Sequence, residues 1–315
     1  MLTKNIQSRA ALEKLVEQAF PNKAFRHIQE LTEGFFNIAY LVAFKDGTEF
    51  VLKIAPHPDT TIMTYEKDIM ATEVASMKLV AEQTSIPLPK VQVSDFSCTL
   101  CNAPYFFMER ISGNSLSSLK EQLQPAELSS IYAQTGKINR QINELTNIYF
   151  GLPGQPSLQG DDWYGVFFAM MRALVQDTKK SGIEISISLE ELLALLQEDK
   201  SIFTEVKRPS LVHWDIWDGN IFIENGKITG LIDWERCLWG DFLMEVGFRS
   251  YSQSADFLNG YGKTHFTVAE KRRIYYYDIY LLIIAAQEHV YRGYEADNGW
   301  AITLMKEKLN ELKSR

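Results

Sequence analysis

The spacing of apolar residues changes near Gly113, and this change limits the folds that the chain can adopt. Residues 26–56 alternate between apolar and polar types in short runs, which is typical of strands. Three-to-four spacing predicts a helix over residues 61–84, and two more strand-like runs follow at 90–93 and 105–109. This order predicts a small antiparallel sheet with one helix packed against it, an α+β layer.

Beyond Gly113 the chain becomes mainly helical. Three-to-four spacing predicts four helices, over residues 125–147, 162–179, 189–199 and 268–292. A strand-rich segment, residues 211–235, interrupts them, and its Asn225-Gly226 pair predicts a hairpin turn. We therefore expect a two-lobed α+β fold. Its parts are a β-rich N-terminal lobe over residues 1–108, a connector over 109–113 and a helical lobe over 114–315.

Composition and charge narrow the classes of function. With 315 residues and 46% hydrophobic content, the chain can give each lobe a core. The first twenty residues read as an amphipathic helix, and no apolar run is long enough for a membrane span, so we expect neither a signal peptide nor a membrane helix. The chain has only three cysteines, and this low number is typical of proteins in the reducing cytoplasm. The net charge of −8 argues against nucleic acid or an anionic membrane as partner and favours a cationic ligand, although many enzymes are acidic for solubility alone.

The strand-rich segment holds the residues best suited to chemistry. Asp215 is followed by Asn220, and Asp233 comes after an intervening hairpin. Phosphoryl transfer needs a carboxylate that takes the proton of the acceptor hydroxyl and oxygen ligands that hold Mg²⁺ against the phosphates. The spacing from Asp215 to Asn220 equals that of the protein-kinase catalytic loop. The alternative is that these residues only form a polar turn, since Asp and Asn are common there.

Here the chain resembles the aminoglycoside phosphotransferase and choline kinase-like group of the protein kinase-like superfamily, whose loop reads His-Gly-Asp with an Asn five residues beyond the Asp. The resemblance spans nearly the whole sequence and implies a protein kinase-like fold. It implies that Asp215 is the catalytic base and that Asn220 and Asp233 hold the metal. His213 would brace the loop, and Asp241, in a Gly-Asp segment typical of the group, would support the site.

The nucleotide lysine of this group corresponds to Lys53. It lies among apolar residues of a strand-like run, where an ammonium is unusual unless it meets phosphate or carboxylate oxygens. We expect its partner to be Glu73 on the next helix, with Glu66 as the competing candidate. Alternatively, Lys53 extends to solvent and Glu73 lies on an exposed helix face.

Two further segments are expected to contact the nucleotide. Residues 32–40 occupy the place of a phosphate-covering loop, although they contain one glycine, Gly34, where protein kinases have several. Residues 107–111 resemble the segment that joins the lobes, so the main chain from Glu109 to Ile111 would bind adenine. The alternative is an edge strand followed by a turn.

The acceptor site is the least defined part of the sequence. Acidic side chains would suit an acceptor that contains amino groups, and the resemblance places the acceptor residues in the helical lobe. The candidates are Asp162, Glu245, Asp278 and Glu288.

The resemblance implies a phosphotransferase that uses ATP or another nucleoside triphosphate with Mg²⁺ to phosphorylate a hydroxyl of a small molecule. An aminoglycoside-like antibiotic or a cationic metabolite is the first expectation. Trp214 stands where the group has Gly, and Trp217 has a counterpart in fructosamine-type kinases, so a fructosamine, amino-alcohol or homoserine-type kinase stays open. A catalytically silent kinase-like binding protein also stays open, and so does a protein kinase, which the single glycine disfavours.

Overall fold

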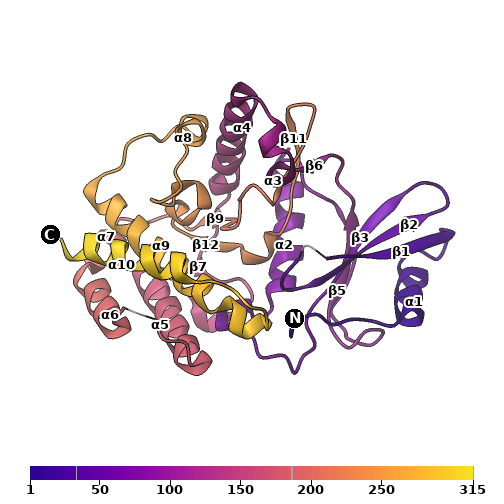
Figure 1. The fold of residues 1–315 in the computed structure, drawn as a ribbon, viewed down its shortest axis with the longest axis horizontal. Helices are drawn as coiled ribbons and strands as arrows, with labels where there is room; N and C mark the ends of the chain where they lie inside the picture. Colours follow the sequence, from indigo (N-terminus) through magenta and orange to yellow (C-terminus); the bar gives the residue numbers. More distant parts are fainter. Residues whose placement is uncertain (33, 186, 315) are drawn as a thin grey trace.

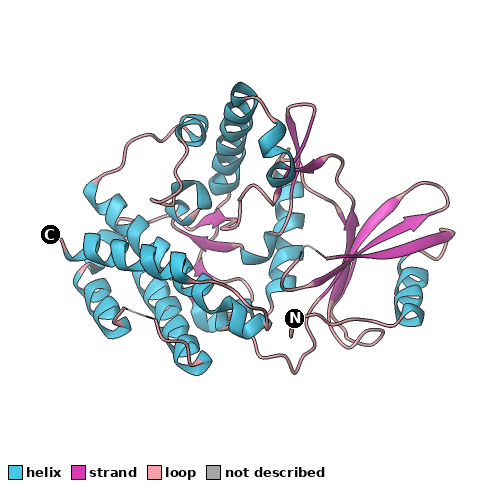
Figure 2. Ribbon diagram, viewed as in Figure 1, coloured by secondary structure: helices cyan, strands magenta, loops and turns pink. Residues whose placement is uncertain are grey.

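The computed structural model describes residues 1–315 except 33, 186 and 315. It has two lobes, a β-rich lobe from the first part of the chain and a larger, mainly helical lobe (Figure 1). The longer strands lie in one lobe and most of the helices in the other (Figure 2). This arrangement confirms the predicted two-lobed α+β fold. In the described part of the chain, no helix is both long and apolar enough to cross a membrane.

The β-rich lobe is built on a five-stranded antiparallel sheet in the order β1-β2-β3-β5-β4. Its strands are β1 (Phe25–Leu31), β2 (Ile38–Phe44), β3 (Glu49–Ile54), β4 (Val91–Asp95) and β5 (Tyr105–Glu109). Helix α1 (Arg9–Ala19) shares a core with this sheet, because Leu12, Leu15 and Val16 are buried with alternate strand residues such as Val42 and Leu52. The predicted strands are therefore present in the predicted order.

Helix α2 (Ile69–Gln83) begins later than residue 61, where the sequence places its start. Residues Thr64–Glu66 form a separate 3₁₀ turn, η1, and Asp68 then takes a left-handed φ of 55°. The carboxylate of Glu66 accepts the main-chain N–H of Met63 at 2.8 Å and a hydrogen bond from Arg292 at 3.1 Å. Because these contacts tie the turn to the helical lobe, the helix cannot extend back through it.

The helical lobe has its core between two long helices. Its helices are α3 (Leu116–Leu119), α4 (Pro125–Glu144), α5 (Trp163–Ser181), α6 (Leu189–Glu198), α7 (Lys200–Phe203), α8 (Ala255–Tyr261), α9 (Val268–Arg292) and α10 (Gly299–Lys313). Phe167 of α5 is buried against Tyr277 of α9, with ring centroids 5.1 Å apart. Helices α4 and α8 meet at Gly136, where a Cβ would lie 2.2 Å from the main-chain oxygen of Phe257. Only glycine permits this close approach.

Two small sheets in the helical lobe carry the loops of the candidate site. One has the order β11-β10-β6, and the other has the order β8-β7-β12-β9. The strands are β6 (Asn114–Ser115), β7 (Phe150–Gly151), β8 (Gln159–Gly160), β9 (Ser210–Val212), β10 (Ile221–Glu224), β11 (Lys227–Leu231) and β12 (Leu238–Gly240). Asn225 and Gly226 have φ of 51° and 73°, as the predicted two-residue hairpin turn requires. The loop between β9 and β10 and the loop between β11 and β12 therefore both connect the same two sheets.

Packing links the two lobes at two places. In one, Val74 and Met77 of α2 share a core with Trp234, which follows β11. In the other, Met63 and Tyr65 are buried among residues of α5 and α9. Strand β5 ends just before the predicted connector and β6 begins just after it, but the segment around Tyr65 packs with the helical lobe. The division of the chain at residue 108 therefore stays a prediction.

Candidate active site

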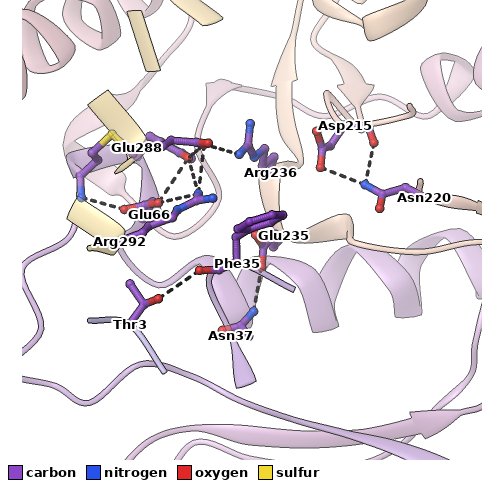
Figure 3. A network of polar contacts seen from close by, with 12 residues as sticks. Thr3, Phe35, Asn37, Glu66, Asp215, Asn220, Glu235, Arg236, Glu288 and Arg292 are labelled. Atoms are coloured by element: carbon purple, nitrogen blue, oxygen red, sulfur yellow. Dashed lines mark hydrogen bonds and ion pairs between the residues drawn. The ribbon is translucent and has the colours of Figure 1, made fainter. Parts of the chain in front are cut away.

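The loop between β9 and β10 presents Asp215 together with Asn220. The side-chain nitrogen of Asn220 donates to both the main-chain oxygen and Oδ2 of Asp215, at 2.9 Å in each case (Figure 3). Asp215 as a whole residue is partly exposed. Burial is the largest influence on its pKa and raises it, while Arg236 and Arg249 act in the opposite direction. Asn220 therefore holds one oxygen of the Asp215 carboxylate in place.

Trp214 takes a left-handed conformation that glycine usually occupies. Its φ is 64°, and the residue is only 1% exposed. The indole ring lies 5.5 Å from the ring of Tyr280 and 6.0 Å from that of Tyr65, measured between centroids. Aromatic packing inside the helical lobe therefore offsets the backbone strain of a non-glycine residue here.

The carboxylate of Glu245 holds the backbone that leads into Asp215. Oε1 accepts the main-chain N–H of His213 at 2.7 Å, and Oε2 accepts that of Trp214 at 3.1 Å. The side-chain nitrogen of Asn143 adds a third hydrogen bond at 3.2 Å. Glu245 is 0% exposed, and both of its carboxylate oxygens are engaged inside the protein. These contacts position the loop that presents Asp215, and acceptor binding by Glu245 stays a prediction.

Glu245→Gln should lower stability by about 1–3 kcal/mol and reduce kcat, because the new amide group places a donor against a buried main-chain N–H. The matched control is Glu144→Gln, which changes an exposed carboxylate paired with Arg140. Urea unfolding and steady-state kinetics would measure both effects. Equal stability and equal kcat in the two variants would contradict the positioning role.

His213 lies fully buried inside the loop, with its ring 4.4 Å from that of Trp234. Nδ1 accepts the main-chain N–H of Asp215 at 3.3 Å. Burial lowers the pKa of His213 to about 4, so the imidazole is neutral near pH 7 and can accept this bond. The geometry suits a residue that braces the loop rather than one that transfers a proton.

Lys53 connects two carboxylates from different parts of the chain. Its Nζ donates to Glu73 Oε1 on α2 at 2.6 Å and to Asp233 Oδ1, which follows β11. Burial alone would lower the pKa of Lys53, but Asp233 and Glu73 raise it above its ordinary value. The structure thus pairs Lys53 with Glu73. The competing candidate, Glu66, bonds Arg292 instead.

Asn220 and Asp233 offer oxygen atoms that suit Mg²⁺. Because the amide nitrogen of Asn220 is bonded to Asp215, the amide oxygen is the atom left for a cation. Burial opposes ionisation of Asp233, yet Lys53 outweighs it and the pKa is lowered. Among the described residues, no group of three or more His, Cys, Asp or Glu side chains could hold a metal ion by itself. Mg²⁺ commonly takes one or two protein ligands and completes its shell with phosphate and water, so this donor set fits.

The expected phosphate-covering loop is tied down by the N-terminal segment. Lys4 Nζ donates to the main-chain oxygen of Asn37 at 2.6 Å, and Thr3 Oγ1 donates to that of Phe35 at 3.1 Å. A Cβ on Gly34 would lie 3.6 Å from Lys4 Nζ, which is an ordinary contact. Space does not require glycine at this position. Glu33, in the same loop, lies outside the described residues.

Glu235 links this loop to the segment that contains Asp233, and the sequence analysis did not identify it. The side-chain nitrogen of Asn37 donates to Glu235 Oε2 at 2.7 Å (Figure 3). Burial, followed by the nearby carboxylates Glu73 and Asp233, raises the pKa of Glu235 to about 8. Its position two residues after Asp233 was the signal that could have identified it.

The connector between the lobes leaves few main-chain groups for adenine. The N–H of Glu109 donates to the main-chain oxygen of Lys90 at 3.0 Å. The N–H of Arg110 donates to that of Glu49 at 3.4 Å. The carbonyl of Glu109 and the main chain of Ile111 therefore remain the candidate adenine contacts.

Two more of the suggested acceptor ligands, Asp162 and Asp278, accept hydrogen bonds from nearby residues of the helical lobe. Asp162 caps α5 by accepting the N–H of Gly165 at 2.8 Å. Asp278 is 1% exposed and accepts both the N–H and the hydroxyl of Ser250, at 3.1 and 2.6 Å. Oδ2 of Asp278 accepts both of these bonds, and the side chain is buried. Acceptor binding by Asp162 and Asp278 stays a prediction.

Glu288, the remaining suggested acceptor ligand, is separated from Asp215 by the side chain of Arg236 in Figure 3. Its Oε1 accepts from Arg236 at 2.6 Å and from Arg292 at 3.0 Å. Sequence reasoning missed both Arg236 and Arg249, whose Nη2 donates to the main-chain oxygen of Trp214 at 3.4 Å. Arg236 could have been identified because it lies three residues after Asp233 in the sequence. No comparable sequence feature points to Arg249.

Asp241 supports the framework behind the site. It is 2% exposed, and Oδ2 accepts from Arg273 Nε and from the hydroxyl of Tyr277, at 2.8 Å each. Oδ1 accepts the N–H of Leu243 at 3.2 Å. These bonds fix the turn that precedes Glu245 against α9.

Comparison with known proteins places this geometry in a family. A model of the phosphotransferase enzyme family matches residues 27–275, which is more than half of the chain. The chain belongs to the phosphotransferase enzyme family. The resemblance drawn from the catalytic loop is therefore confirmed, and so is the expectation of a phosphotransferase at the level of the family.

Curated relatives of this phosphotransferase match only parts of it. A subtelomeric hrmA-associated cluster protein of Aspergillus fumigatus is 34% identical over 116 residues, which cover 36% of this chain and 22% of that protein. Hygromycin-B 4-O-kinase of Escherichia coli is 28% identical over 170 residues, which cover 51% of this chain and 47% of that protein. The chain therefore spans less than half the length of these curated relatives.

A solved structure matches almost the whole fold. It is a thermostable mutant of aminoglycoside phosphotransferase APH(4)-Ia in a ternary complex with ADP and hygromycin B. The TM-score is 0.67 at 18% identity, and the match covers 95% of this chain and 98% of that one. This likeness supports the kinase-like fold.

Proposed function

We propose that this phosphotransferase transfers the γ-phosphoryl group of ATP to a hydroxyl group of a small molecule with the help of Mg²⁺. The observation that carries the proposal is the position of Lys53, whose ammonium bonds both Glu73 and Asp233. An ammonium joined to one structural carboxylate and one metal-ligand candidate is the arrangement that kinases use to hold nucleotide phosphates.

The other residues of the site would accept the proton, hold the metal ion and bind the nucleotide. Asp215 would accept the proton of the acceptor hydroxyl, since Asn220 holds one of its oxygens and the residue is partly exposed. Asn220 and Asp233 would hold Mg²⁺, which would neutralise charge on the phosphates when it is bound. Lys53 would orient the phosphates, and the main chain of the connector would bind adenine. Most of the rate enhancement would come from positioning and charge.

The acceptor is proposed at the level of a small molecule. The name of one relative, hygromycin-B 4-O-kinase, supports including aminocyclitol antibiotics among the candidates. A silent binding protein with this fold is the competing function. It is disfavoured because the base, both metal-ligand candidates and the lysine pair are all in place.

The state of the cysteine thiols supports a cytoplasmic location. The three cysteines, Cys98, Cys101 and Cys237, are free in the structure. Free thiols persist in a reducing compartment. We therefore propose that the enzyme works in the cytoplasm.

Nucleotide binding and turnover test the proposal separately. Calorimetry with AMP-PNP should show binding that depends on Mg²⁺. ADP release from ATP should then rise with one class of acceptor in a panel of aminoglycosides, amino alcohols, sugars and hydroxy acids. Binding without release in any class would favour the silent protein, and absence of nucleotide binding would contradict the kinase site itself.

A further inference from the structure

Two guanidinium groups lie beside Asp215. Arg236 follows the metal segment, and Figure 3 shows its side chain between Glu288 and Asp215. Arg249 donates through Nη2 to the main-chain oxygen of Trp214, the residue directly before Asp215. Both arginines are close enough to lower the pKa of Asp215, although burial, the larger effect, raises it.

The two guanidinium groups have donors to spare. A guanidinium carries five N–H donors. The side chain of Arg236 is 12% exposed, and it donates to Glu288 at 2.6 Å. In the described part of the chain, the buried Nε of Arg249 has no hydrogen-bond partner. Both residues are partly exposed, as is Asp215.

The carboxylates of this region are already engaged. Oε1 of Glu288 accepts from Arg236, from Arg292 and from the hydroxyl of Tyr65, at 2.6, 3.0 and 3.4 Å. Glu66 is 2% exposed and accepts from Arg292 at 3.1 Å. An ammonium group on the acceptor would compete with these internal partners for Glu66 and for Oε1 of Glu288. The structure therefore offers an acceptor more open donors than open carboxylates.

The geometry points to an acceptor that carries an oxyanion, either a carboxylate or a phosphate monoester, bound by Arg236 and Arg249 beside the hydroxyl that Asp215 deprotonates. This inference rests on the proposed function. The acceptor oxygen forms a bond to the γ-phosphorus, the bond from that phosphorus to the β-phosphate oxygen breaks, ADP leaves, and the hydroxyl proton passes to Asp215. The arginines bind the oxyanion and take no part in the proton transfer.

Charge distinguishes this class from a polycationic acceptor. Planar guanidinium groups bind carboxylate and phosphate through paired hydrogen bonds, and such bonds are stronger than neutral ones. An ammonium in the same place would face two like charges in a partly desolvated site, which is unfavourable. The overall negative charge of the chain suggested a cationic ligand. Beside Asp215, carboxylates such as Glu288 lie close to the two arginines, and the proposal rests on the unused donors of those arginines.

Matched ligands and variants test this inference. Gluconate, glucose 6-phosphate, glucose and glucosamine place a carboxylate, a phosphate, no charge or an ammonium on similar polyols. Their binding to the full chain in the presence of Mg²⁺ and ADP would be measured by calorimetry at millimolar concentration. The proteins would be the wild type, Arg236→Gln, Arg249→Gln and the control Arg9→Gln, which removes an exposed guanidinium on α1.

We expect gluconate or glucose 6-phosphate to bind more tightly than glucose and glucosamine, and the stronger of the two identifies the type of oxyanion. Each active-site variant should weaken that binding by about 10- to 100-fold, and Arg9→Gln should leave it unchanged. Arg236→Lys, which keeps the charge, should retain part of the affinity and guards against a folding defect in Arg236→Gln.

Tighter binding of glucosamine than of both anions would overturn the inference. Failure of both anions to bind, or equal binding in all variants, would do the same. Failure of the proposed function is visible apart from this result, because it would appear as loss of the Mg²⁺-dependent binding of ADP in the wild type.

Discussion

Asp215→Asn should lower kcat by about 10²- to 10⁴-fold and leave the Kd of Mg²⁺ and AMP-PNP unchanged. The amide cannot accept the proton of the hydroxyl at neutral pH. Its oxygen can still accept the hydrogen bond from Asn220, so the loop should keep its shape. Steady-state kinetics and calorimetry on the same preparation would separate loss of chemistry from loss of binding.

The matched control for this variant is Asp218→Asn in the same loop. Asp218 bonds Lys120 at 2.6 Å and the hydroxyl of Tyr132, so it anchors the loop at its other end. We expect this control to retain most of its kcat. A similar fall in both variants would mean that Asp215 acts through the loop structure and not as a base.

Asp233→Ala should weaken the binding of AMP-PNP in the presence of Mg²⁺ by about 100-fold or more. Loss of an outer partner of a metal ligand already costs about 10- to 100-fold in metal affinity, and a direct ligand should cost at least as much. The variant also leaves Lys53 with only Glu73 of its two carboxylates. Calorimetry with and without Mg²⁺ would measure the part of the affinity that depends on the metal.

The control for the second variant is Asp46→Ala, at the exposed turn between β2 and β3, where Asp46 pairs with Lys23. It removes the same charge far from the nucleotide segment and should bind AMP-PNP as the wild type does. If Asp233→Ala keeps the full Mg²⁺-dependent affinity, Asp233 is not a metal ligand and the proposed roles around Lys53 have to be revised.

Local signals explain which parts of the fold could be predicted. The range predicted for α9 agrees with the structure, because Thr267 and Glu270 form a capping box at its start and Gly293 takes a left-handed φ at its end. The start of α2 could not be predicted in the same way. It depends on the bond between Glu66 and Arg292, two residues 226 positions apart.

In the candidate site, too, residues with a local sequence signal could be predicted, and residues positioned by contacts distant in sequence could not. The pairing of Lys53 with Glu73 followed from a lysine in a strand and an acidic residue on the next helix, and the structure contains that pair. The part played by Glu245 did not follow, because its partners are main-chain groups of His213 and Trp214, which apolar spacing cannot reveal. Arg249 was missed for the same reason, since its contact with the loop arises only after folding.

The most direct test of the central claim is mass spectrometry of the acceptor after incubation with ATP, Mg²⁺ and either the wild type or Asp215→Asn. We expect the acceptor to gain one phosphoryl group with the wild type, only when Mg²⁺ is present, and to stay almost unmodified with the variant. Release of ADP without a phosphorylated acceptor, or equal product from both proteins, would contradict a kinase that uses Asp215 as its base.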